Sequence, residues 1–339
     1  MEDTIKEMQE EILALKRQNM ALIDAMKTLT GAVSEMKGSI DYCLNGFAEQ
    51  GITLQNLPYE IMDPDFRQSV YYPHVMSNAE TLEQVEGGKS ICRFGDGEFS
   101  AIACVQRWKF QKADRKLSER LKEVLSSKKE NVVVALNNYY GAVFMSEDTD
   151  NCRAVRHYLT PEVRKRHLEL LSATRVYGNA DVFFPRVMEK ARAIQRLWKD
   201  QDCIIVEGVK TRFGVGNDLL NGARSVQRIL CPARNAFDRY DEILGYVQQQ
   251  SKEKLILISL GPTATVLAYD LANAGYHAVD IGHCDIAYEA YCRLDHSVSS
   301  VEGTNLVYKD YIAGGGEPEA IMDVQDETYL KEIISDFSK

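Results

Sequence analysis

The feature that most limits how this chain can fold is a series of short apolar runs, each followed by a segment long enough for a helix. The clearest runs span residues 131–136, 203–206 and 255–260, and none of them alternates apolar with polar residues. Unbroken apolar strands of this kind are typical of parallel sheets that helices cover on both faces. We therefore predict an α/β fold built on a largely parallel sheet, starting near residue 75.

Weaker patterns complete the predicted order of elements. We expect further strands at 90–94, 174–177, 225–230 and 277–281, and helices at 78–86, 97–107, 114–127, 161–171, 182–199, 236–250 and 262–274. In an open parallel sheet, ligands bind beyond the carboxyl ends of the strands. We therefore expect four turns to meet at one edge, namely those at 94–98, 206–218, 260–263 and 280–289.

The first of these turns carries two acidic residues one position apart. Asp96 and Glu98 stand beside two glycines, which let the backbone turn sharply and approach a ligand closely. Carboxylate oxygens suit Mg²⁺ or Mn²⁺, and magnesium sites commonly combine one or two carboxylates with substrate phosphates. Arg93 adds a fixed positive charge that suits phosphate. The alternative is a solvated turn whose acids only favour the start of a helix.

The turn at 207–218 is long and rich in glycine and basic residues, which are the components of an anion-binding loop. It lacks the lysine followed by Ser or Thr, at the required spacing, that defines a P-loop. Its candidate ligands are Thr211, Arg212, Gly216 and Asn217. The alternative is a surface loop in which Asn217 or Asp218 caps the next helix.

Two further turns supply polar groups at strand ends. The first offers backbone amides and a hydroxyl at a helix N-terminus, which suit phosphate, from Gly261, Pro262 and Thr263. The second offers candidates for a general base, from Asp280, His283 and Asp285. Structural readings remain open for both turns: a well-capped helix start for the first, and a histidine that only donates structural hydrogen bonds for the second.

Residues 1–47 repeat apolar residues with heptad spacing. One seam position holds Ile5, Ile12, Asn19, Met26, Val33, Ile40 and Phe47, and the other holds Met8, Leu15, Leu22, Leu29, Met36 and Cys43. The pattern predicts a coiled-coil stalk that assembles the chain into a homodimer or higher homo-oligomer. The alternative is an amphipathic helix packed on its own domain. A linker with three prolines is expected at 48–74, and the main domain at 75–339.

Charge and cysteine content limit the binding partners and the cellular compartment that we expect. The formal net charge is −10, so a broad electrostatic grip on nucleic acid is not expected. The eight cysteines form no C-x-x-C pair, which disfavours a zinc ribbon and fits a reducing compartment. Neither a signal peptide nor a transmembrane run is visible, so we expect a cytoplasmic protein.

The motif segments at 93–98, 207–218, 260–270 and 275–289 together resemble the GT-D glycosyltransferase family, which was first catalogued as a domain of unknown function. The resemblance covers roughly residues 75–310. It implies a Rossmann-like fold and a metal-dependent sugar transfer from a nucleoside diphosphate sugar, such as UDP-glucose or a similar hexose donor. The family occurs in bacterial glycosylation loci, so the implied acceptor is a glycan or glycoprotein.

The resemblance also assigns roles to residues of this sequence. The family's Asp-x-Glu motif binds metal and diphosphate, and it matches Asp96 and Glu98, which are expected to hold Mn²⁺ or Mg²⁺. Donor binding is expected from Arg93, Phe94, Gly95, Thr211, Arg212, Gly216, Asn217, Gly261, Pro262 and Thr263. Deprotonation or orientation of the acceptor is expected from Asp280, His283 or Asp285.

Two alternative functions come from other classes. A metal-dependent phosphohydrolase acting on a nucleotide sugar would need no acceptor for full turnover. A coiled-coil adaptor with a degenerate nucleotide-binding domain would have no activity, but the intact acidic motif at 96–98 argues against degeneration.

Overall fold

The computed structural model describes residues 2–62, 73–105, 110–137, 167, 169–172, 174–184, 188–292, 317–318, 321 and 323–338. The chain separates into two compact units: one contains the N-terminal helix, and the other begins at Arg67 and contains the sheet.

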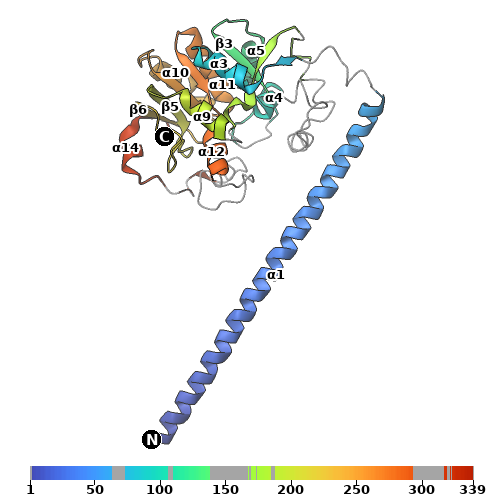
Figure 1. The fold of residues 1–339 in the computed structure, drawn as a ribbon, viewed down its shortest axis with the longest axis vertical. Helices are drawn as coiled ribbons and strands as arrows, with labels where there is room; N and C mark the ends of the chain where they lie inside the picture. The colour runs from blue at the N-terminus through green and yellow to red at the C-terminus, as the bar shows by residue number, and fades with distance from the viewer. Residues whose placement is uncertain are drawn as a thin grey trace. The chain divides into compact units, whose positions relative to one another are not determined.

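The second unit is organised around one parallel sheet (Figure 1). In the described residues the strand order is β1-β4-β3-β2-β8-β7-β5-β6-β9, and every neighbouring pair is parallel. The strands are β1 (His74–Val75), β2 (Ser90–Phe94), β3 (Val132–Leu136), β4 (Val176–Asn179), β5 (Asp202–Gly208), β6 (Ser225–Cys231), β7 (Leu255–Ser259), β8 (His277–Asp280) and β9 (Ile333–Asp336). The predicted α/β class with a largely parallel sheet is confirmed.

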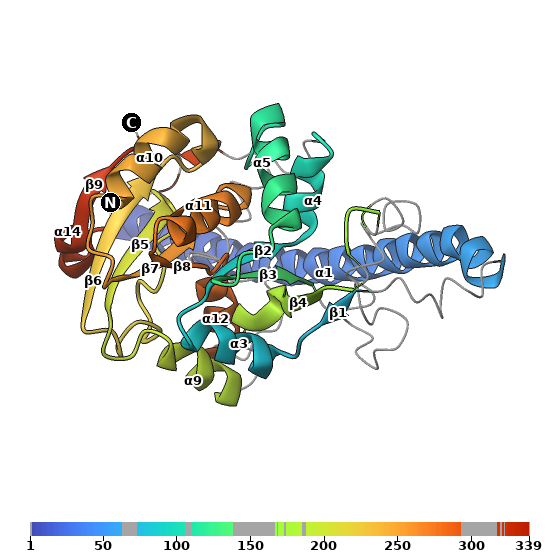
Figure 2. The same cartoon turned by 90° about the horizontal axis from the view of Figure 1, so that it is seen from above.

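Helices cover both faces of this sheet, as Figure 2 shows. One face carries α4 (Asp96–Ile102), α5 (Arg115–Ser126), α10 (Tyr240–Val247) and α11 (Pro262–Asn273). The other carries α3 (Asn78–Glu86), α9 (Met188–Arg196) and α12 (Cys284–Cys292), whose apolar side chains form one cluster with the inner residues of the central strands. Because both faces are covered, all five residues of β3 and of β7 are buried, which explains their unbroken apolar sequence.

Local signals fix where the helices begin and end. Ser77 and Glu80 form a reciprocal capping box at the start of α3. Asp114 accepts a hydrogen bond from the Leu117 amide at 2.8 Å and caps α5. Helix α11 begins with Pro262 at its first position, and Gly275, at a φ of 86°, follows its end in the left-handed conformation.

Several elements differ from the sequence-based expectation. Strands β1 and β9 and the short helix α14 (Glu327–Glu332) were not predicted, because they lie at the half-exposed edges of the sheet and have no continuous apolar run. The helix expected at 182–199 is divided: a 3₁₀ turn, η1 (Ala180–Phe183), precedes α9. The helix expected at 236–250 also opens with a 3₁₀ turn, η2 (Ala236–Arg239). The helix expected at 161–171 lies largely outside the described residues.

The first unit contains the long helix α1 (Glu2–Met62). It continues past residue 47, so the extended linker expected at 48–74 cannot begin before residue 63. Residues 52–57 contain neither glycine nor proline, so no strong stop signal lies between Gly51 and Pro58, and the helix continues through both to Met62. No helix in the described part of the chain is long and apolar enough to cross a membrane.

The packing at Gly178 of β4 gives a direct test of the sheet. A Cβ placed on Gly178 would lie 2.5 Å from Cγ1 of Val133, whereas a Cβ on Gly245 of α10 would meet nothing within 4 Å. We expect Gly178→Ala to lower the free energy of unfolding by about 1–3 kcal/mol through overpacking. The control, Gly245→Ala, should raise it by about 0.5–1 kcal/mol because alanine favours the helix. Urea denaturation measures both, and an unchanged stability for Gly178→Ala would contradict the register of β3 and β4.

Candidate functional site

The candidate site lies where β2 and β8 run side by side. On one side of β2 the chain adds β3 and then β4. On the other side of β2 lie β8, β7, β5 and β6. A crevice at such a point of reversal is where open parallel sheets bind ligands. The end of β2 and the turn after it carry Arg93, Asp96 and Glu98, and the end of β8 and the turn after it carry Asp280 and His283.

Asp280 joins the two turns. Its carboxylate is buried and accepts hydrogen bonds from the Arg93 amide at 3.2 Å, the Thr265 hydroxyl at 3.1 Å and the Gly282 amide at 3.3 Å. The Thr265 hydroxyl also lies 3.0 Å from the Arg93 carbonyl oxygen. Burial raises the pKa of Asp280, while the Arg93 charge and these hydrogen bonds oppose that shift. Because its oxygens are engaged in this way, Asp280 is suited to positioning its neighbours.

The guanidinium of Arg93 is enclosed but only partly satisfied. Its side chain is 12% exposed, its Nε lies 3.9 Å from an Asp280 oxygen, and its Nε and Nη1 have no hydrogen-bond partner among the described residues. The group lies over the rings of Phe183 and Phe184, 5.8 Å and 5.6 Å from their centres. A Cβ at Gly282 would collide with it, so glycine is required there. Enclosed N–H donors without partners indicate an anionic ligand.

The acidic motif opens helix α4. Glu98 accepts a hydrogen bond from the Gly95 amide at 2.7 Å and so caps its own helix. Its pKa is raised to about 7, first by burial, then by the charge of Asp280, with a smaller contribution from Asp96. The charges of Asp280 and Asp96 thus disfavour the ionised form of Glu98, and a nearby positive charge would relieve this effect.

Two side-chain oxygens lie beside the Gly95 backbone. A Cβ at Gly95 would lie 3.3 Å from Oε2 of Glu98 and 3.4 Å from Oδ1 of Asn137. The Asn137 oxygen is buried, and it has no hydrogen-bond partner within the part of the chain that the structure describes. Among the described residues no group of three His, Cys, Asp or Glu is arranged to hold a metal. A magnesium-type ion here would therefore need further ligands from a substrate, which is usual for such ions.

A polar chain extends the site along the ends of β3 and β4. Asn137 donates to a carboxylate oxygen of Asp181 at 2.7 Å, and Lys190 donates to the Asp181 carbonyl oxygen at 2.7 Å. Asn179 accepts the Asp181 amide at 2.9 Å and starts the 3₁₀ turn η1. Sequence reasoning missed Asn137 and Thr265. The available signal was a polar residue directly after an apolar strand in the first case and a buried helical hydroxyl in the second.

A buried ion pair supports the loop after β5. Glu207, fully buried, accepts the Phe213 amide at 2.7 Å and an Arg228 N–H at 2.7 Å. Arg228 also donates to the Phe213 carbonyl oxygen at 2.9 Å and to Glu332 of α14 at 2.6 Å. Lys210 donates to Asp323 at 2.6 Å, so its positive charge is paired with a carboxylate of the protein. The loop is therefore fixed in shape before any ligand arrives.

The predicted ligands in this loop lie at the same sheet edge as the acidic motif, but β7 and β8 separate β5 from β2, a span of about 14 Å. Arg212 and Gly216 have left-handed backbone, with φ of 57° and 82°. Thr211 is buried, and its amide donates to the Gly208 carbonyl oxygen. Asn217 accepts the Leu219 amide at 3.0 Å and reaches Glu289 of α12 at 3.4 Å.

The turn at 261–263 lies beside the start of α4. A Cβ at Gly97 would lie 3.9 Å from the Pro262 ring. Gly261 has a φ of 55°, and the Phe110 ring packs against it so closely that a side chain would not fit. Thr263 is fully buried, with its hydroxyl 3.4 Å from Gln111. The helix start is thus near the motif, while the Thr263 hydroxyl faces the protein.

The three predicted base candidates differ in accessibility. His283 is exposed, and its ring meets the Phe184 ring edge-on with 4.7 Å between centres. Asp285, in the first turn of α12, and Asp280 are both buried. Of the three, His283 can meet an incoming molecule without a rearrangement.

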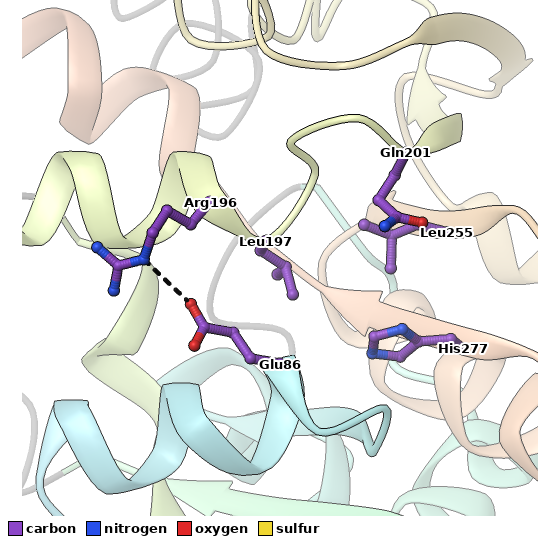
Figure 3. Close-up of a pocket in the computed structure, with 6 residues that line it drawn as sticks. All are labelled: Glu86, Arg196, Leu197, Gln201, Leu255 and His277. Carbon is purple, nitrogen blue, oxygen red and sulfur yellow. Dashed lines mark ion pairs between the residues drawn. The ribbon is translucent and has the colours of Figure 1, made fainter.

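A hollow of about 340 Å³ lies at the opposite edge of the sheet (Figure 3). Leu255 and His277, which begin β7 and β8, line it together with Glu86, Arg196, Leu197 and Gln201. Arg196 and Glu86 form an ion pair at one side of it, with 3.7 Å between Nε and a carboxylate oxygen. Because parallel sheets bind ligands at the carboxyl ends of their strands, we do not assign the chemistry to this hollow.

Comparisons with known proteins agree with this geometry. Residues 91–305 match the family described as the glycosyltransferase GT-D fold. The chain is 37% identical over 242 residues to the probable glycosyl transferase Gly of Streptococcus gordonii, covering 68% of this chain and 34% of that protein. It is 33% identical over 229 residues to the glycosyltransferase GlyD of Streptococcus pneumoniae, covering 62% and 26%. The chain thus spans about a third or less of the length of these relatives.

Solved structures share the fold. A new glycosyltransferase of the domain of unknown function 1792 from Streptococcus sanguinis aligns with a TM-score of 0.66 and 31% identity, over 78% of this chain and 99% of that one. A second structure, described as the highly conserved domain of unknown function 1792 with a distinct glycosyltransferase fold, aligns with a TM-score of 0.69 and 29% identity, over 79% and 97%.

The raised pKa of Glu98 predicts how stability depends on pH. Between pH 4.5 and about 7 the folded protein keeps a proton on Glu98 that the unfolded chain has released, so the free energy of unfolding falls as the pH rises. Glu98→Gln keeps an acceptor for the Gly95 amide but cannot ionise. In EDTA it should be more stable than the parent at pH 8, by up to roughly 3 kcal/mol, and should lose this advantage at pH 4.

Urea denaturation at both pH values measures this difference. Glu253→Gln, at the exposed residue 253 before β7, is the matched control and should follow the parent at both pH values. Equal stability of Glu98→Gln and the parent at pH 8 would show that Glu98 is not electrostatically strained.

Proposed function

The chain belongs to the GT-D glycosyltransferase family, and from this premise we propose that it is a metal-dependent glycosyltransferase. Its donor is a UDP-sugar, such as UDP-glucose or a similar hexose donor, and its acceptor is a glycan or glycoprotein. The observation that carries the proposal is the pairing, at the carboxyl ends of β2 and β8, of a partly unsatisfied Arg93 guanidinium with the crowded carboxylates of Asp96 and Glu98. Such a pairing suits a diphosphate and its cation together.

In this proposal Asp96 and Glu98 hold Mn²⁺ or Mg²⁺, with the Asn137 oxygen close by. The ion supplies neutralisation of the negative charge that develops on the departing diphosphate. Arg93 donates its free N–H groups to a phosphate oxygen, and planar guanidinium donors suit that geometry. Asp280 and Thr265 act as positioning residues, because they fix the backbone and charge of Arg93.

The remaining predicted residues have roles around this centre. The backbone of Phe94 and Gly95 shapes the turn. The amides of Gly261 and Thr263 would face the same donor, because the Pro262 ring between them lies 3.9 Å from the position that a Cβ at Gly97 of α4 would take. The loop carrying Thr211, Arg212, Gly216 and Asn217 would contact the part of the donor that extends along the sheet edge. His283, the exposed base candidate, is assigned to the acceptor hydroxyl, and the buried Asp285 to the support of α12.

The long helix takes no part in the chemistry of this proposal. We assign residues 1–47 to self-association of the chain, as a homodimer or higher homo-oligomer. We also place the enzyme in the cytoplasm: the described cysteines are free thiols, several of them in the core, which fits a reducing compartment.

Calorimetry of UDP binding tests the metal assignment. We expect UDP to bind the parent in the presence of Mn²⁺ and at least tenfold more weakly in EDTA, because the carboxylates repel the diphosphate without a cation. Asp96→Asn and Glu98→Gln should abolish the Mn²⁺ effect, and Glu253→Gln should retain it. Equal UDP affinity of the parent with Mn²⁺ and with EDTA would overturn the metal assignment. Release of UMP and sugar 1-phosphate from the UDP-sugar at the full rate without any acceptor would instead indicate a phosphohydrolase.

A conservative exchange tests the role of Arg93. Arg93→Lys keeps the positive charge beside Asp280 but loses the planar pair of donors, so we expect the Kd for UDP to rise about tenfold while the Tm stays close to that of the parent. Arg192→Lys, on the exposed side of α9, is the control and should change neither value. Unchanged UDP affinity in Arg93→Lys would remove Arg93 from the donor site.

A further inference from the structure

Helix α1 presents a long apolar stripe to solvent. The helix has 61 residues, a length of about 90 Å. Large apolar side chains along it are 53% to 71% exposed at Met8, Ile12, Leu15, Leu22, Met26, Leu29, Val33, Met36, Ile40 and Phe47. Helices in water gain most of their stability from packing an apolar face, so a helix of this kind requires a partner.

The spacing of the stripe identifies the kind of partner. Its members alternate three and four residues apart over six heptads, which is the repeat of helices that supercoil around one another. We propose that a second copy of this chain covers the stripe, and that the two helices form a parallel, in-register, two-stranded coiled coil. This inference does not depend on the chemistry proposed for the sheet domain.

The side chains at the seam favour two strands. The first seam position holds the β-branched residues Ile12, Val33 and Ile40, and the second holds leucine in three successive heptads, at 15, 22 and 29. β-Branched residues at the first position with leucine at the second favour parallel dimers over trimers and tetramers.

Polar residues fix the direction and register of the pair. In a parallel in-register dimer, Asn19 faces Asn19 of the second copy, and the two amides can hydrogen-bond across the axis. In an antiparallel pair centred on the heptads, Asn19 would instead face apolar residues and leave a polar group unsatisfied. Glu11 and Lys16 occupy flanking positions five residues apart, where parallel chains pair opposite charges.

Other features of the helix agree with a second copy and disfavour a lipid surface. The outer positions 31 and 38 are glycines at which an added Cβ would meet nothing within 4 Å, so this side can remain in solvent. Residues 1–47 contain five Lys or Arg and eight Asp or Glu. Interfacial membrane helices are instead rich in basic residues on their polar face.

Matched lysine variants of the full chain test the seam. Leu22→Lys with Leu29→Lys puts two charges in the seam, while Ala21→Lys with Thr28→Lys puts the same two charges on the outer face one residue away. Light scattering should give the mass of two chains for the parent and the outer-face variant, and of one chain for the seam variant. A parent mass of one chain, or of three or more, would overturn the proposal, as would a dimeric seam variant.

Cys43 can report whether the two helices run parallel to each other. It is exposed and occupies the second seam position, so a parallel in-register pair places the two Cys43 thiols side by side. Oxidised glutathione should therefore link the parent into a covalent dimer, and Cys43→Ser should remove this link although other exposed cysteines remain. A dimer by light scattering that forms no link through Cys43 would overturn the parallel register.

Discussion

The candidate site depends on the burial of one carboxylate between two parallel strands. Asp280 ends β8, and the amide that it accepts belongs to Arg93 of β2, so this hydrogen bond crosses the point where the strand order reverses. Burial penalises the charge of Asp280, and the guanidinium and hydroxyl beside it offset part of that penalty. Burial and then the charge of Asp280 raise the pKa of Glu98, so Asp280 acts on both the positive and the negative part of the site.

A second buried pair, Glu207 with Arg228, shapes the loop after β5, and helix α12 connects this loop to the first centre. Tyr288 of α12 donates to Asp218 at 2.8 Å, and Glu289 lies 3.4 Å from Asn217. The same helix begins directly after His283. A displacement of α12 would therefore move the loop and the His283 turn together, which gives the sheet edge one continuous frame for a ligand as long as a nucleotide sugar.

The sequence was sufficient to predict the parallel sheet and the edge at which its turns meet, because strands buried on both faces leave an unbroken apolar pattern in the chain. It was not sufficient for contacts between distant residues. The pairing of Glu207 with Arg228, the bridge made by Thr265 and the proximity of Asn137 to Glu98 depend on which strands are neighbours. The edge strand β9 was missed because it carries no strong periodic signal, and the helical residues 48–62 were missed because Pro58 indicated a linker where the helix in fact continues.

The acidic motif also stabilises the start of α4, and this affects how its carboxylates are oriented before a ligand binds. Asp96 and Glu98 both lie in the first turn of α4, and the charge of Asp96 adds to the burial and the Asp280 charge that raise the pKa of Glu98. Glu98 satisfies the Gly95 amide, and the amino end of the helix favours negative charge, so the fold itself holds both carboxylates in place. Helix α4 can therefore form without a cation, and the proposed metal and diphosphate would meet ligands that are already oriented, which reduces the entropy lost on binding.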